Sequence, residues 1–380
     1  MKKTAISLIL ALAMVLSFVL VAAPQAQAAG HTTHCVCGGK AAGVGDHTAC
    51  ANVTETWVDL NAYVNDAANK DADGYAPLKA GAYYLSADLQ LEKQLKPIDD
   101  GVEITICLNG FELKGNADKA QAHSKVMFVN KKATVNICDC KGTGKMSSIS
   151  EKQGAVILVD ADKKGPVLNL FSGTLIGSPN TTAAGGNVRI NDGGVLNIYK
   201  AILKDGKNVN GQGGNLMSNG SSGKECEINM FGGAILNGNA KSYGGNIYIM
   251  NSVTLNISGG TISGGVAGTA GKDIYADKES STIKIKNLEA GTACTLTYTS
   301  ATLDVSELAA TVTKGADADT DPLTFTHTFT AAAATPSTPS NPSKPNNPAT
   351  GDSANLVVMG LGLVLGVAGI ACLLPKKQEI

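Results

Sequence analysis

The residues best suited to chemistry lie near the start of the chain. Three histidines and three cysteines fall between positions 31 and 50, namely His31, His34, Cys35, Cys37, His47 and Cys50. One residue separates Cys35 from Cys37 and two separate His47 from Cys50, so both members of each pair can reach one ion. We predict either a tetrahedral zinc site on Cys35, Cys37, His47 and Cys50, with His34 as a substitute ligand, or a disulfide from Cys35 or Cys37 to Cys50.

Acidic residues form no comparable cluster. Hydrolysis of a polysaccharide needs two or three carboxylates at one bond, and the lyase reaction needs a base, often beside calcium. The candidates Asp139, Asp160, Asp192 and Asp205 are scattered, and the Gly-His-Gly and Arg-any-Lys motifs of polygalacturonase-like enzymes are absent. The sequence therefore gives us no residue to assign as catalytic.

The N-terminus has the pattern of a secretory signal peptide over residues 1–29. Lys2 and Lys3 precede an apolar run from Ile6 to Ala23, and the small residues Ala26 and Ala28 follow it. This order of charge, apolar segment and small-residue exit predicts export. The alternative is a retained membrane anchor.

The C-terminus has the order of a surface anchor. A Pro/Ser/Thr-rich linker spans residues 331–350, and its end overlaps the motif Asn347-Pro348-Ala349-Thr350-Gly351. An apolar run over 356–374 is about long enough to cross a bilayer, and Lys376 and Lys377 follow it.

This arrangement over residues 347–380 resembles the sorting signal of Gram-positive surface proteins that are processed by sortases. The usual pattern is Leu-Pro-any-Thr-Gly, and here Asn347 stands in the first position. The resemblance implies cleavage after Thr350 and attachment of that residue to peptidoglycan, with sortase and peptidoglycan as partners. The alternative is a plain membrane anchor, and both readings place the body outside the cell.

Composition narrows the class of the roughly 300 residues between the two ends. The net charge is −1 and charged residues make up 17%, so no basic excess indicates a nucleic-acid partner. There are 44 glycines, and aromatic residues make up only 4% of the chain. Many glycines with few aromatic residues favour a solenoid with tight turns.

An apolar–polar–apolar triplet recurs about every 30 residues. Its copies begin at Ile104, Val135, Leu168, Leu196, Ile228, Leu255 and Ile283, with Thr, Asn or Lys in the middle. A second apolar strand precedes each triplet, as at 126–129, 155–159, 186–190, 214–217, 245–249 and 273–275, and a third follows, as at 111–113, 174–176, 202–203, 234–236 and 261–262. Gly-rich corners precede the third strand at 172–173, 232–233 and 259–260.

Three short strands and three turns per repeat predict one coil of a parallel β-helix. Stacked coils bury a continuous apolar column that no single coil could bury alone. Residues 80–290 resemble the pectate-lyase-like right-handed β-helix superfamily, so we expect an all-β, right-handed solenoid of about seven coils. The alternative fold is a β-propeller, which needs four antiparallel strands per blade.

The predicted organisation follows from these patterns. After the signal peptide come the Cys/His-rich segment over 30–52, the β-helix with its N-terminal cap over 53–290, and a C-terminal β cap over 291–330. The linker and the sorting signal complete the chain.

Residues at equivalent positions of neighbouring coils should form rows. One predicted row is Asn187, Asn215, Asn246 and Asp273, which we interpret as a structural ladder at a turn. Another holds Phe171, Tyr199 and Phe231, and Cys107 with Cys138 shares that position on earlier coils, either as a disulfide or as stacked thiols. Phe171, Tyr199, Phe231, Tyr248 and Tyr275 are the predicted binding surface.

These observations predict a non-enzymatic, wall-anchored display protein that binds glycans or host surfaces, in the manner of an adhesin. One alternative is a polysaccharide lyase or glycoside hydrolase with its active site in the loops 177–186 or 204–213. A second alternative is a structural spacer.

Overall fold

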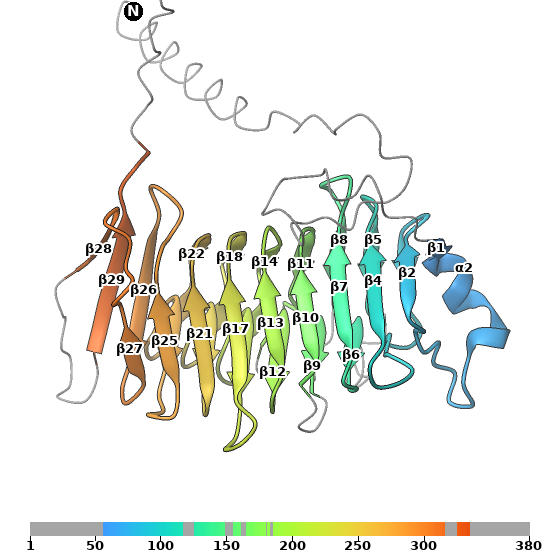
Figure 1. Ribbon diagram of the computed structural model, residues 1–380, viewed down its shortest axis with the longest axis horizontal. Coiled ribbons are helices and arrows are strands. Elements are labelled where there is room, and N and C mark those ends of the chain that lie inside the picture. Colours follow the sequence, from blue (N-terminus) through green and yellow to red (C-terminus); the bar gives the residue numbers. More distant parts are fainter. Residues whose placement is uncertain are drawn as a thin grey trace, which may run out of the picture. The chain divides into compact units, whose positions relative to one another are not determined.

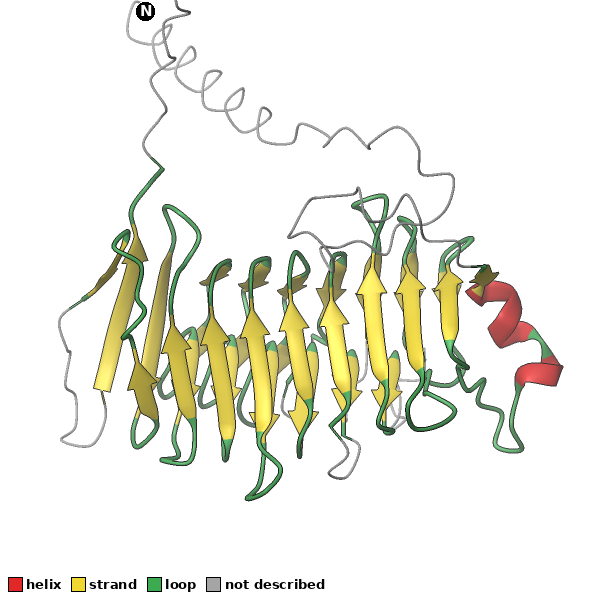
Figure 2. Ribbon diagram, in the orientation of Figure 1, coloured by secondary structure: helices red, strands yellow, loops and turns green. Residues whose placement is uncertain are grey.

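The protein is a parallel β-solenoid of about seven turns with almost no helix (Figures 1 and 2). The computed structural model describes residues 56–116, 125–148, 155–160, 165–179, 181–182, 185–315 and 325–334. Successive turns add one strand to each of three long sheets, so strand neighbours in a sheet are one turn apart in the sequence. The predicted parallel β-helix is confirmed.

A ten-stranded sheet holds all seven triplets. They lie in β4 to β25 and pair in parallel, with Ile104 opposite Val135 and Leu168 opposite Leu196. The sheet runs in the order β1 (Trp57–Asp59), β2 (Gly81–Tyr84), β4 (Glu103–Cys107), β7 (Thr134–Cys138), β10 (Val167–Leu170), β13 (Val195–Ile198), β17 (Cys226–Met230), β21 (Val253–Ile257), β25 (Thr282–Ile285) and β27 (Thr302–Asp304).

The predicted second and third strands build the other two long sheets. The nine-stranded sheet contains β6 (Met127–Val129), β9 (Ile157–Val159), β12 (Val188–Asn191), β16 (Leu216–Asn219), β20 (Ile247–Ile249), β24 (Ile274–Ala276), β26 (Ala293–Tyr298), β29 (Phe325–Ala331) and β28 (Val312–Lys314). The seven-stranded sheet contains β3 (Leu89–Gln90), β5 (Glu112–Lys114), β8 (Lys145–Ser147), β11 (Thr174–Ile176), β14 (Ile202–Lys204), β18 (Ala234–Leu236) and β22 (Thr261–Ser263).

A small three-stranded sheet was not predicted. Its strands are β15 (Lys207–Asn208), β19 (Asn239–Ala240) and β23 (Val266–Ala267). They are only two residues long, which is too short for an apolar alternation to mark them in the sequence.

The core is one continuous aliphatic cluster between the sheets. The flanking residues of the triplets are almost wholly buried, as are their counterparts on the other two sheets. The corner between the ten-stranded and seven-stranded sheets needs a left-handed backbone, and Gly173, Gly233 and Gly260 have φ of +94°, +73° and +88°. At Gly233 a Cβ would also lie 2.3 Å from the carbonyl oxygen of Ala201.

Both ends of the solenoid are covered. At the N-terminal end, α2 (Leu60–Asn65) is capped by Asp59, which accepts hydrogen bonds from the backbone of Asn61 and Ala62, and η2 (Ala67–Asn69) follows. At the other end the chain reverses, because β29 pairs antiparallel with both β26 and β28. The reversal covers the last coil with the buried Phe329 and ends parallel stacking.

A buried amide ladder closes the coils. Asn187 Nδ2 donates to Asn215 Oδ1 at 2.7 Å, Asn215 donates to Asn246 at 2.8 Å, and Asn246 donates to Asp273 Oδ1 at 3.0 Å. Asn215 Nδ2 also donates to the carbonyl of Leu236 at the end of the same coil. Each asparagine therefore bonds its own coil to the next one. It also bonds the start of its coil to the end of the same coil, and these contacts confirm the predicted ladder.

The ladder ends on a carboxylate. Asp273 also accepts from the backbone N–H of Gly265 at 3.1 Å and of Thr295 at 3.0 Å. Burial raises the pKa of the Asp273 carboxyl, and these hydrogen bonds offset part of that rise.

We predict that Asn215→Ala lowers the free energy of unfolding by about 3–5 kcal/mol, because it leaves buried partners such as the Gly206 N–H unsatisfied. Asn251→Ala is the control, since it removes one hydrogen bond from a half-buried side chain, to Asn219, and should cost about 1 kcal/mol or less. Chemical denaturation measures both, and equal losses would contradict a closing role for Asn215.

Candidate ligand-binding face

The outer face of the ten-stranded sheet carries a row of asparagines. The middle residues of five successive triplets are Asn136, Asn169, Asn197, Asn229 and Asn256. Each of the last four donates from Nδ2 to Oδ1 of the asparagine on the preceding coil, at 2.7–2.9 Å. Because an amide has two N–H groups and two acceptor lone pairs, each retains hydrogen-bonding capacity for a ligand.

Only part of this row is accessible. Asn136 and Asn169 are 3% and 7% exposed, whereas Asn197, Asn229 and Asn256 are half-buried. Polar contact with a ligand is therefore restricted to the C-terminal half of the row.

An aromatic row lies directly after the ends of three of these strands, two residues beyond the asparagines. Phe171 and Tyr199 stack with ring centroids 4.9 Å apart, and Tyr199 and Phe231 stack at 5.1 Å. Stacking covers the ring faces inside the row, and Phe171 is fully buried. Phe231 is 46% exposed, and the next position in line is the small Ser258. The row therefore offers one open ring face, at its Phe231 end.

The third outward row contains few charges. It runs through Glu103, Thr134, Val167, Val195 and Glu227 before Thr254 and Thr282. Glu103 and Glu227 are four coils apart, or about 19 Å at the usual strand spacing. Asp304 lies in the row of the asparagines, three coils beyond Glu227. The two carboxylates are therefore at least about 14 Å apart along the stack. Glycosidase carboxylates are separated by about 5–9.5 Å, so these residues cannot act together on one bond.

Tyr248 and Tyr275 do not share this face. They lie on the nine-stranded sheet, stack with each other at 5.9 Å, and are only 3% and 7% exposed because Tyr243 and Met217 pack around them. The five aromatic residues of the predicted surface thus form two groups on different sheets. Tyr248 and Tyr275 are mostly covered.

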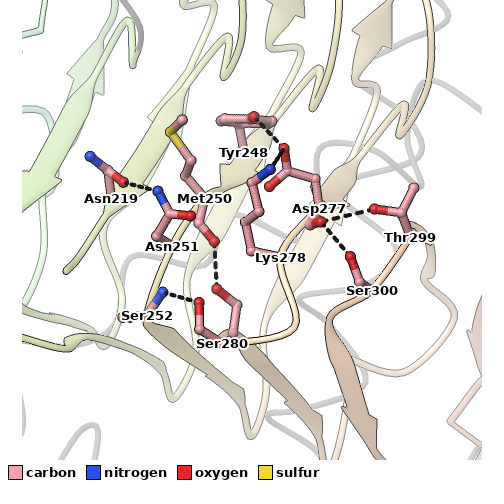
Figure 3. Close-up of polar contacts among 11 residues, drawn as sticks. Asn219, Tyr248, Met250, Asn251, Ser252, Asp277, Lys278, Ser280, Thr299 and Ser300 are labelled. Carbon is pink, nitrogen blue, oxygen red and sulfur yellow. Dashed lines mark hydrogen bonds and ion pairs between the residues drawn. The ribbon is translucent and has the colours of Figure 1, made fainter. Parts of the chain in front are cut away.

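Polar contacts hold Tyr248 in place (Figure 3). The Tyr248 hydroxyl donates to Asp277 Oδ2 at 3.0 Å, and Lys278 Nζ lies 4.0 Å from the same oxygen. The side chains of Thr299 and Ser300 donate to the Asp277 carbonyl at 3.0 and 2.8 Å. Burial, with the nearby Asp277 charge, raises the pKa of Tyr248, so its phenol stays neutral. These contacts join successive turns.

The scattered aspartates also have structural partners. Asp139 accepts from the backbone of Gly110 and Gly144 at 2.7 and 2.6 Å. Each of the other three accepts from a side chain one coil away: Asp160 from Asn191, Asp192 from Ser221 and Asp205 from Asn237.

Cys107 and Cys138 lie in register on adjacent coils, as predicted, and both are thiols. They are buried in one cluster with Phe171, at the base of the aromatic row. Sequence reasoning missed the nearby Cys140, whose Sγ lies 3.5 Å from Cys107 Sγ. Cys140 lies two residues after Cys138 in the sequence, and this spacing could have indicated that its side chain is close to the same position.

The remaining predicted sites lie outside the described residues. These are His34, Cys35, Cys37, His47 and Cys50, the signal peptide, the motif over 347–351 and the span over 356–374. Within the described part, no three His, Cys, Asp or Glu side chains are placed to hold a metal ion. The helices of that part are not long and apolar enough to cross a membrane.

Comparison of the chain with protein-family models, with curated proteins and with solved structures gives no match.

Proposed function

We propose that this chain is a secreted display protein that is anchored to the cell wall and binds glycans without cleaving them. The observation that carries the binding role is the open face of Phe231 beside half-buried Asn229 and Asn256. The C–H face of a pyranose can pack on an aromatic ring while its hydroxyls bond to amides, which both donate and accept.

The geometry around Phe231 suits one or two sugar rings. Phe231 directly follows β17, two residues after Asn229, and its N–H still bonds to the preceding coil at Ile198, so the two side chains project to the same side about 7 Å apart. Asn256 extends the polar row by one coil, and its Nδ2 lies 3.5 Å from Glu227 Oε1. A ring that covers Phe231 would therefore have its edge beside the amide row.

The local charge favours a neutral ligand. Lys284 follows Asn256 in the middle row and lies opposite Asp304, while Lys286 is paired with Glu307 at 2.5 Å. Glu227 adds a negative charge, so cations and anions nearly balance. An acidic polysaccharide would find no net positive surface here.

The surface location rests on the two ends of the sequence. The signal-peptide pattern over 1–29 supports export, and the motif over 347–351 with the apolar run and basic tail supports attachment by a sortase. The resemblance of the repeats to the pectate-lyase-like superfamily supports a polysaccharide as the ligand. The wide spacing of the carboxylates on this face argues against hydrolysis of the bound polysaccharide there.

We predict that Phe231→Ala weakens binding to a neutral oligosaccharide at least tenfold, because the open ring face is lost. A glycan array identifies the ligand, and calorimetry then compares the variants. Phe128→Ala is the matched control, because Phe128 is a half-buried phenylalanine on the nine-stranded sheet.

An unchanged affinity in Phe231→Ala would contradict this placement of the site. The release of new reducing ends, or of an unsaturated uronide, would contradict the non-enzymatic role.

Anchoring to the cell wall depends on Thr350. Thr350→Ala in the producing cell should remove the protein from the fraction that is released by muramidase, because Thr350 would form the bond to peptidoglycan. Thr338→Ala, the same change within the linker, should leave the protein in that fraction. Wall attachment that survives Thr350→Ala would contradict sortase processing.

A further inference from the structure

Three thiols meet at the base of the aromatic row. Cys107 ends β4 and Cys138 ends β7, and the two are opposite each other in the ten-stranded sheet. Cys140 lies in the turn that follows β7, with its Sγ 3.5 Å from Cys107 Sγ. Cys140 is partly exposed, whereas Cys107 and Cys138 are 0% and 1% exposed.

Geometry favours Cys140 over Cys138 as the partner of Cys107. Side chains in register on neighbouring parallel strands point the same way and keep the strand spacing of about 4.8 Å. A disulfide needs its two Cβ atoms about 3.5–4.5 Å apart, so a strict in-register pair is poorly placed. Cys140 lies in a turn, so its distance from Cys107 is not set by the spacing of the strands. The Cys138 thiol donates to the carbonyl of Ile106 at 3.6 Å, whereas the Cys107 thiol donates to Cys140 Sγ.

We propose that Cys107 and Cys140 form a disulfide when the protein meets an oxidising environment, and that Cys138 stays reduced beside it. The two sulfurs must approach from 3.5 Å to about 2.05 Å. That movement is small because Asp139 already joins the two turns, accepting from the backbone of Gly110 on one coil and of Gly144 on the next.

The order of the reaction follows from exposure. The Cys140 thiolate attacks a low-molecular-weight disulfide, forms a mixed disulfide and releases one thiolate. The sulfur of Cys107 then attacks Cys140 Sγ, the second small thiolate leaves, and that thiolate takes up the proton that Cys107 gives up. Overall, two protein thiols are oxidised to one disulfide while one small disulfide is reduced to two thiols.

The environment of Cys107 agrees with this order. Its contact with Cys138, together with burial, raises the pKa of the Cys107 thiol to about 12, and the hydrogen bond with Cys140 offsets part of that rise. Cys107 is therefore protonated at neutral pH, and the more exposed Cys140 is the thiol that reacts first. The other described cysteines, Cys226 and Cys294, are each buried, and burial raises the pKa of both thiols. They serve as internal controls.

The bond would fix the base of the aromatic row. Cys107 and Cys138 share a buried cluster with Phe171, against which Tyr84 and Tyr199 pack. A link from the end of β4 to the turn after β7 joins two successive coils covalently at this point. The oxidised protein should therefore melt at a higher temperature than the reduced protein.

Peptide mapping of the full-length protein tests the proposal. The folded protein is exposed to a small disulfide, remaining thiols are alkylated after denaturation, and cleavage before Asp139 separates Cys138 from Cys140. The expected result is a cross-link between the peptides of Cys107 and Cys140, with Cys138, Cys226 and Cys294 alkylated.

Two variants make the result decisive. Cys138→Ser should retain the cross-link at the wild-type yield, whereas Cys140→Ser should lose it and leave Cys107 open to alkylation after denaturation. Circular dichroism checks that each variant is folded. A Cys107–Cys138 cross-link in the wild type, or full alkylation of Cys107 and Cys140 after oxidation of the folded protein, would overturn the proposal.

Discussion

No coil of this protein can bury its own apolar side chains, so each coil depends on the coils above and below it. This constraint requires every triplet to lie in register with its neighbours, since a shift of one residue would turn its aliphatic side chains outward. In-register stacking then places residues of the same type next to one another on neighbouring coils. For asparagine the result is favourable, because one amide can donate to the next along the stack. The buried ladder from Asn187 to Asp273 and the outer row from Asn136 to Asn256 both follow from this.

The same constraint limits where a ligand can bind. Aromatic rings at equivalent positions stack face to face, so Phe171 and Tyr199 cover each other and contribute little open ring surface. The row offers a ring face only where it stops, at Phe231 beside Ser258. A repetitive surface can thus hold a single binding position, and the position is set by the last aromatic residue in the row.

Much of this could be predicted from the sequence because stacking converts a repeat directly into contacts. The seven triplets fixed the sheet, its register and the outward rows. The prediction failed where the strands lack apolar alternation, as in Lys145–Ser147 of β8, which buries only Met146, and in the three-stranded sheet. It also failed for residues that depend on the path of a turn. Cys140 reaches Cys107 from a turn, and Tyr243 covers Tyr248 and Tyr275. Turn paths vary between coils, so the repeat carries no information about them.

Nuclear magnetic resonance of the side-chain amides tests the central claim most directly. Titration with a neutral oligosaccharide found by the array should shift the amide signals of Asn229 and Asn256 and the ring signals of Phe231. The buried ladder of Asn187, Asn215 and Asn246 should not respond. Shifts confined to the loops 177–186 and 204–213, or to the tyrosines of the nine-stranded sheet, would contradict the account.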